Sequence, residues 1–155
     1  MTELLALAAL GAFVSAAITD IRTRQIPNSL VLFLACLGLV RLAMDLWAGF
    51  ELAAVGLDLA LAGLVFLGGI ALFATGLMGG GDVKLMAAAS IWFGTAGTVE
   101  FLISTVLAGG VLACFFLMRR GARRLAGGPS ASSADSLPYG VAIALGGVLV
   151  TLQIL

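Results

Sequence analysis

Two aspartates, Asp20 and Asp82, are the residues of this sequence best suited to chemistry. Each lies at one end of a long apolar run. A charged group is costly to insert there, so it is expected to have a function or a partner. Two carboxyl groups brought together share one proton: the ionised member draws a proton from water while the protonated member polarises a carbonyl group under attack. The sequence therefore predicts hydrolysis by a pair of aspartates, with the individual roles of acid and base left open.

Three glycines, Gly79, Gly80 and Gly81, stand directly before Asp82. Glycine permits unusual backbone angles and close approach by another chain, and irregular backbone at membrane depth is tolerated where it lines a cavity. We therefore interpret this segment as an active-site loop rather than only a helix stop. Lys84, two residues beyond Asp82, is either a membrane anchor or a group that steadies a carboxylate.

The segment after Asp20 contains two arginines and a proline. Pro27 lacks an amide donor and disfavours helix at the preceding residue, so the chain is expected to turn before Asn28. Arg22 and Arg24 are typical of topological anchors, and either could also steady an ionised Asp20. Both arginines, Pro27 and Asn28 are therefore candidate site residues.

Composition places these groups in a membrane protein. Of 155 residues, 62% are apolar and only 10% are charged, whereas soluble domains carry about 25% charged residues. The sequence has no histidine, and its two cysteines are isolated from each other. These absences argue against a Ser-His or Cys-His nucleophile and a CxxC metal site, so neither a metal nor another cofactor is expected.

Six apolar runs predict an all-α fold with six transmembrane helices, forming a single domain over residues 1–155. The runs cover residues 3–19, 29–47, 52–75, 83–97, 98–118 and 137–155. Lipid cannot satisfy backbone polar groups, so such runs must be helices, and the lack of two-residue alternation argues against a barrel. A tight turn is expected at 94–98 and a flexible basic cytoplasmic loop at 119–136.

Charge placement predicts the orientation of these helices. Seven of the eight basic residues fall on the connections at one side, which is therefore expected to be cytoplasmic. Both termini then lie on the other side, and Asp20 and Asp82 both lie at the cytoplasmic face. The runs that carry them are shorter than the roughly 20 residues that cross a bilayer core, which places both aspartates slightly beneath the surface.

Arg41 and Asp58 lie at similar depth if the second and third runs form a hairpin. We predict that they pair in the outer half of the membrane. A catalytic role for Asp58 is disfavoured because it lies on the opposite side from Asp20 and Asp82.

The segments around Asp20 and Asp82 resemble the two motifs of type IV prepilin peptidases, which are membrane aspartyl proteases of the GxGD class. Gly79, Gly81 and Asp82 fill the GxGD pattern, and the sequence at 138–140, Pro-Tyr-Gly, is also similar to the family. The resemblance covers essentially the whole chain. It implies that the two aspartates are the catalytic pair of a bacterial inner-membrane protein. Its activity would be removal of a short basic leader from prepilin or pseudopilin precursors at the cytoplasmic face.

One departure from this family concerns a second activity. Longer members have a cytoplasmic insertion with paired CxxC zinc ligands and also N-methylate the trimmed pilin. Here the first cytoplasmic connection covers only residues 20–28 and no CxxC is present. The chain therefore resembles the short, peptidase-only form associated with Flp/Tad-type pili, for which neither zinc nor N-methyltransferase activity is expected.

Two other functions remain alternatives. One is an ion- or proton-coupled membrane transport component with the acids as a relay, and the other is a non-catalytic subunit of a pilus or secretion assembly. Acids spread through the membrane depth would favour transport, whereas here two are expected at one face. The expected partners are the precursor and membrane lipid, with no nucleic acid.

Overall fold

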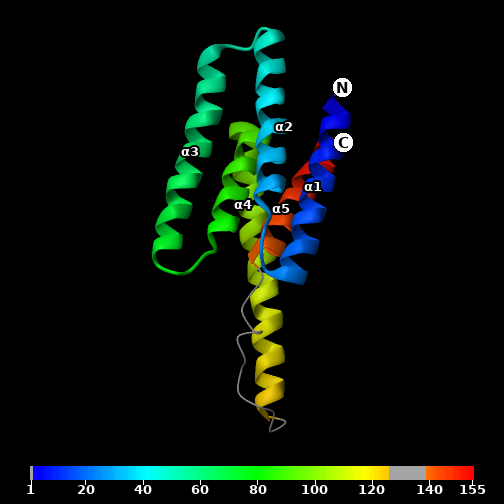
Figure 1. The fold of residues 1–155 in the computed structure, drawn as a ribbon, viewed down its shortest axis with the longest axis vertical. Coiled ribbons are helices and arrows are strands. Elements are labelled where there is room, and N and C mark those ends of the chain that lie inside the picture. Colours follow the sequence, from blue (N-terminus) through cyan, green and yellow to red (C-terminus); the bar gives the residue numbers. More distant parts are fainter. Residues whose placement is uncertain (1, 126–138) are drawn as a thin grey trace.

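The computed structural model describes residues 2–125 and 139–155, and every regular element in these ranges is a helix (Figure 1). The helices are α1 (Thr2–Thr23), α2 (Asn28–Trp47), α3 (Leu52–Ala74), α4 (Gly80–Leu125) and α5 (Tyr139–Ile154). The predicted all-α class is confirmed for this part of the chain. Helices α1 to α4 are long and apolar enough to cross a membrane, and α5 is a shorter apolar helix.

Helix α4 reverses its direction at Gly94. This glycine has a φ of 65° and a ψ of −169°, which interrupts the helix and which glycine adopts without steric cost. The hydroxyl of Thr98 donates a hydrogen bond of 3.1 Å to the carbonyl of Ser90, although residues eight apart in a straight helix are about 12 Å apart. The two segments of α4 therefore run antiparallel, as Figure 1 shows, and the reversal falls within the predicted turn at 94–98.

The core lies where α1, α5 and both segments of α4 meet. The ring of Phe93 stacks on that of Phe13 with centroids 5.8 Å apart and lies 5.3 Å from that of Phe101. Gly147 of α5 packs directly on Phe13, where an added Cβ would overlap the ring. Such close approach at small residues is how helices associate in lipid, where apolar surface alone drives no association.

The predicted ion pair between Arg41 and Asp58 is confirmed. Nη2 of Arg41 lies 2.7 Å from Oδ2 of Asp58, and Nη1 lies 3.0 Å from the carboxylate of Asp45. The other oxygen of Asp58 accepts hydrogen bonds from the amide of Thr95 at 2.6 Å and from its hydroxyl at 2.7 Å. An added Cβ on Gly94 would lie 2.7 Å from Asp58. The ion pair therefore fastens α2 and α3 to the reversal of α4.

Several helix boundaries differ from the prediction. Helix α1 continues past residue 19 to Thr23, and α4 begins at Gly80, so both aspartates lie in terminal helical turns rather than in connections. The sequence has no proline before Pro27 that would end α1 earlier. The carbonyl of Gly79 accepts the first helical hydrogen bond of α4, from the amide of Val83, at 3.2 Å.

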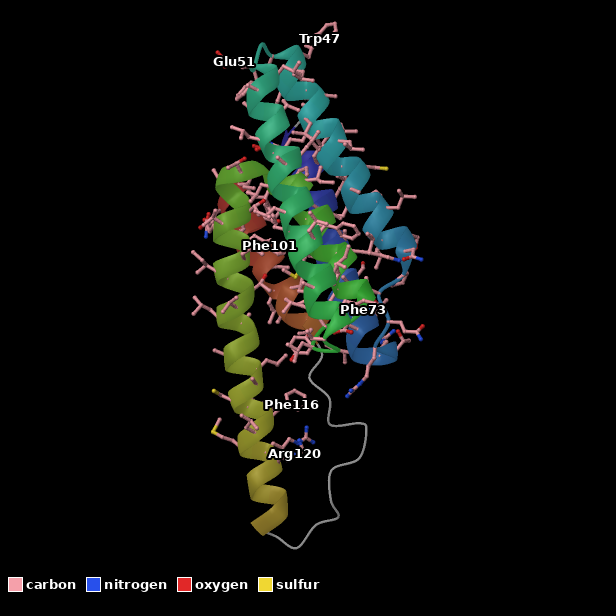
Figure 2. All side chains as sticks on the ribbon, turned by 90° about the vertical axis from the view of Figure 1, so that its left-hand side faces the viewer. Trp47, Glu51, Phe73, Phe101, Phe116 and Arg120 are labelled. Atoms are coloured by element: carbon pink, nitrogen blue, oxygen red, sulfur yellow. The ribbon has the colours of Figure 1, made fainter. Side chains whose placement is uncertain are left out.

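The first part of the predicted basic loop at 119–136 is helical instead. Helix α4 runs on to Leu125, because arginine, alanine and leucine are good helix formers. Residues 126–136 of that predicted loop lie outside the described residues. Figure 2 places Arg120 toward the opposite end of the bundle from Trp47 and Glu51.

The ion pair makes a testable prediction about stability. Replacing Asp58 alone by leucine leaves Arg41 with Asp45 as its remaining counter-ion, so the loss of stability is expected to be small. Replacing Arg41 alone by leucine leaves Asp58 charged without a counter-ion, which is expected to lower the free energy of unfolding by roughly 3 kcal/mol. Replacing both removes the stranded charge and is expected to recover most of that loss. Thermal unfolding in detergent measures this, with Glu100→Gln, the loss of an exposed carboxylate, as the control. A double variant no more stable than the worse single variant would show that the pair contributes nothing.

Candidate active site

Asp20 lies in the last turn of α1 and faces the start of α5. The helix ends because Arg24 adopts a φ of 54°, while its amide donates to the carbonyl of Asp20 at 2.9 Å. The residue is only 6% exposed. Its Oδ2 accepts a hydrogen bond of 3.1 Å from the amide of Val141, in the first turn of α5. A helix N-terminus has amides without intrahelical partners and a partial positive charge, so it stabilises this carboxylate.

Asp82 lies in the first turn of α4, directly after the glycine segment. Its Oδ2 accepts a hydrogen bond of 3.3 Å from the amide of Gly79, three residues earlier. Asp82 is the third residue of α4, and its side chain accepts the amide of Gly79, the residue before the helix. This bond is one of the two that make up a capping box. The close approach explains the glycine, because a Cβ at Gly79 would lie 2.9 Å from Oδ2 of Asp82.

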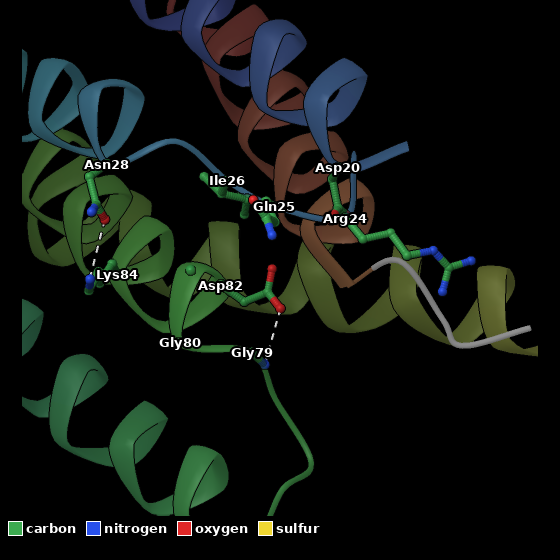
Figure 3. A pocket seen from close by; sticks show the side chains of 10 residues that line it. Asp20, Arg24, Gln25, Ile26, Asn28, Gly79, Gly80, Asp82 and Lys84 are labelled. Carbon is green, nitrogen blue, oxygen red and sulfur yellow. Dashed lines mark hydrogen bonds between the residues drawn. The ribbon is translucent and has the colours of Figure 1, made fainter. Parts of the chain in front are cut away.

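The two carboxyl groups belong to one pocket. In Figure 3 the side chain of Asp82 extends from α4 toward the end of α1 that carries Asp20. The pocket has a cavity volume of about 320 Å³. It is lined by Asp20, Arg24, Gln25, Ile26, Asn28, Gly79, Gly80, Gly81, Asp82 and Lys84.

Two further lining residues connect the helices around this pocket. Nζ of Lys84 donates a hydrogen bond of 3.2 Å to Oδ1 of Asn28, which joins α4 to α2 at the rim (Figure 3). The side chain of Arg24 extends away from Asp82 in the same view. Lys84 is thus positioned to brace the pocket and to present a positive charge beside it.

The structure brings most of the candidate residues together, with two exceptions. Arg22 does not line the pocket, and its exposed side chain follows Asp20 on the outside of α1. Pro27 does not line it either and instead precedes the first residue of α2 with an extended backbone. Its place there explains the turn that brings Asn28 to the rim.

Sequence reasoning missed three contributors to the site. Gln25 and Ile26 line the pocket, and Val141 donates to Asp20 from a helix 121 residues away. The family resemblance at 138–140 drew attention to Gly140, the residue next to Val141. No pattern in the sequence indicated that this segment contacts Asp20. Among residues 2–125 and 139–155, no group of three or more histidine, cysteine, aspartate or glutamate residues could hold a metal ion.

The sequence also matches a known protein family. The sequence model of the type IV leader peptidase family matches residues 7–114, which include both aspartates and more than half of the chain. The chain belongs to the type IV leader peptidase family.

Two curated members of this family illustrate the relationship. A prepilin leader peptidase/N-methyltransferase of Xanthomonas campestris pv. campestris is 30% identical over 133 residues, which are 84% of this chain and 43% of that protein. A prepilin leader peptidase/N-methyltransferase of Bacillus subtilis is 35% identical over 135 residues, which are 86% of this chain and 49% of that protein. The match thus covers less than half of each relative. No solved structure matches the chain significantly.

The packing around the glycines at 79–81 leads to a second testable prediction. A Cβ at Gly81 would lie 3.3 Å from that of Ile26, whereas one at Gly80 would meet Phe73 at an ordinary 3.5 Å. Gly81→Ala is expected to lower stability by about 1 kcal/mol through overpacking, and Gly80→Ala is expected to change it less. Thermal unfolding in detergent measures both variants.

A size-compensating substitution tests the cause. Adding Ile26→Ala to Gly81→Ala makes room for the new methyl group and is expected to reduce the overpacking. If the loss of stability in the combined variant equals the sum of the losses in the two single variants, the contact between Gly81 and Ile26 is not what constrains this glycine.

Proposed function

We propose that this chain is a membrane-embedded aspartic endopeptidase that removes the leader peptide from type IV prepilins or pseudopilins. The observation that carries the proposal is the pocket to which Asp20 and Asp82 come from two different helices, 62 positions apart in the sequence. Membership of the type IV leader peptidase family supports the same activity.

The chemistry follows from the pair of carboxyl groups. One of them, ionised, takes a proton from a water molecule, while the other, protonated, gives its proton to the oxygen of the scissile amide. Neither group needs a metal ion for this reaction. The surrounding amides hold both side chains in place before the substrate arrives, which reduces the reorganisation that the transition state requires.

We also propose six membrane crossings. As a straight helix, the 42-residue apolar span within α4 would be about 63 Å long, twice the roughly 30 Å of a bilayer core. The reversal at Gly94 instead lets each segment cross separately. With α1, α2, α3 and α5, this arrangement has six crossings and both termini on one side.

The charges then orient the protein in the bacterial inner membrane. Arg24 and Lys84 line the pocket, and Arg22 lies in the last turn of α1 with Asp20. In Figure 2, Arg120 lies toward the opposite end of the bundle from Glu51. By the positive-inside rule, the pocket faces the cytoplasm. A precursor whose apolar helix lies in the membrane would present its leader junction at this face, with membrane lipid around both.

A second activity is not part of this proposal. Both relatives are named as N-methyltransferases as well as peptidases. Here the connection between α1 and α2 is a short turn, and the two cysteines lie apart on α2 and α4. With no CxxC pair to form a zinc site, the peptidase-only form of Flp-like pili fits better.

The arrangement of the third acid argues against a transport function. A relay needs acids that are free to exchange protons through the depth of the membrane. Asp58 instead has one oxygen paired with Arg41 and the other bonded to Thr95. It therefore serves the fold.

The peptidase proposal makes a direct prediction. Asp20→Asn and Asp82→Asn each remove one member of the pair, so each is expected to lower precursor processing by at least about 10³-fold without loss of membrane insertion. Co-expression with an Flp-like prepilin, followed by gel separation of precursor and mature forms, measures this.

The matched control is Glu100→Gln, which removes a carboxylate from the start of the second segment of α4, just after the reversal at Gly94. It is expected to process the precursor at the wild-type rate. Wild-type processing by either aspartate variant would contradict the proposal, and so would failure of the wild-type protein to cut any Flp-like precursor.

The proposed topology has its own test. Single cysteines are introduced at Thr23, Phe50 and Glu100 in a variant in which Cys36 and Cys114 are replaced by alanine. A membrane-impermeant maleimide added to intact cells that have a permeabilised outer membrane is expected to label positions 50 and 100. Position 23 is expected to react only after the inner membrane is opened. Labelling of position 23 in intact cells would reverse the orientation, and protection of position 100 would contradict two crossings by α4.

A further inference from the structure

The first turn of α5 holds the carboxyl group of Asp20 more closely than any group holds Asp82. Oδ2 of Asp20 accepts a hydrogen bond of 3.1 Å from the amide of Val141, in the first turn of α5. The α-carbon of Gly140 lies so close that an added Cβ would be 2.7 Å from both Cγ and Oδ2 of Asp20. An amide at a helix N-terminus, where the helix dipole is positive, favours an anion over a neutral acid.

Asp82 has a weaker set of donors. In the described part of the chain, the hydrogen bond to its carboxyl group comes from the amide of Gly79 at 3.3 Å. Nζ of Lys84 is directed to Oδ1 of Asn28 rather than to Asp82. Because both carboxyl groups line one pocket, a negative charge on Asp20 disfavours a second negative charge on Asp82.

We propose that Asp20 is the ionised member of the pair and acts as the base, and that Asp82 carries the shared proton and acts as the acid. This assignment rests on the proposed peptidase function. Gly140 is then a positioning residue, because only a residue without a side chain lets the amide of Val141 reach Asp20.

The assignment sets the course of each proton. The carboxylate of Asp20 takes a proton from water, the water oxygen bonds to the carbonyl carbon, and Asp82 gives its proton to the carbonyl oxygen, which forms a gem-diol. Asp20 then gives its proton to the amide nitrogen while Asp82 takes one from a gem-diol hydroxyl. The C–N bond breaks, a carboxylic acid and an amine leave, and both aspartates return to their starting states.

Carbon NMR of the protein without substrate tests the assignment independently of catalysis. Full-length protein is labelled with [4-¹³C]aspartate in detergent micelles, and the two carboxyl resonances are assigned from Asp20→Asn and Asp82→Asn. At neutral pH, Asp20 is expected to have the chemical shift of a carboxylate and Asp82 that of a carboxylic acid. The reverse order, or two carboxylates, would overturn the proposal.

Two substitutions test the part played by α5. Gly140→Ala pushes the carboxyl group away from the amide of Val141, and Val141→Pro removes that donor without adding bulk at position 140, in a first helical turn that tolerates proline. Both are expected to move the Asp20 resonance toward the carboxylic acid position. Both are also expected to lower kcat by at least about tenfold with little change in KM. The control is Gly110→Ala, where an added Cβ meets nothing within 4 Å.

The outcomes separate this inference from the proposed function. If both aspartates are needed for processing but the resonances of Gly140→Ala and Val141→Pro match those of the wild type, the role of α5 is wrong and the peptidase stands. If either Asp→Asn variant processes the precursor normally, the peptidase function itself is wrong, whatever the resonances show.

Discussion

A carboxylate in an apolar helical bundle needs a donor that lipid cannot supply, and three aspartates here meet that need in the same way. Asp20 accepts an amide from the first turn of α5, Asp82 accepts the amide that precedes α4, and Asp58 accepts the amide of Thr95, where α4 resumes after its reversal. Each carboxylate thus satisfies a helix N-terminus that would otherwise remain without a partner. The arrangement of the helices and the placement of the acids therefore depend on the same hydrogen bonds.

This shared constraint fixes both ends of the first segment of α4. At one end, Asp82 and Gly79 form the start of the helix beside the pocket. At the other end, the ion pair of Arg41 and Asp58 holds the reversal against α2 and α3. The segment between them packs its aromatic side chains into the core. Asp82 is consequently held by a rigid helix rather than by a mobile loop, which suits a group that must meet a second carboxyl group with little freedom.

The sequence predicted those features that depend on a single segment or on charge. Apolar runs predicted the helices, Gly94 predicted the reversal, and similar depth in a hairpin predicted the pair of Arg41 and Asp58. Contacts between distant segments were not predictable in this way. No local pattern indicates that Val141 donates to Asp20, because the two meet only when α5 packs beside α1. The predicted helix ends were also wrong, because a helix can continue beyond its apolar residues. Helix α1 continues through Arg22 to Thr23.

The central claim is that Asp20 and Asp82 act together on one water molecule. A prepilin-derived peptide whose scissile amide is replaced by a hydroxyethylene group places a hydroxyl where both carboxyl groups would bind it. Titration calorimetry then compares its affinity for the wild type, Asp20→Asn and Asp82→Asn. The wild type is expected to bind at least about a hundredfold more tightly than either variant, because the peptide is a transition-state analogue. Equal affinity for all three proteins would contradict it.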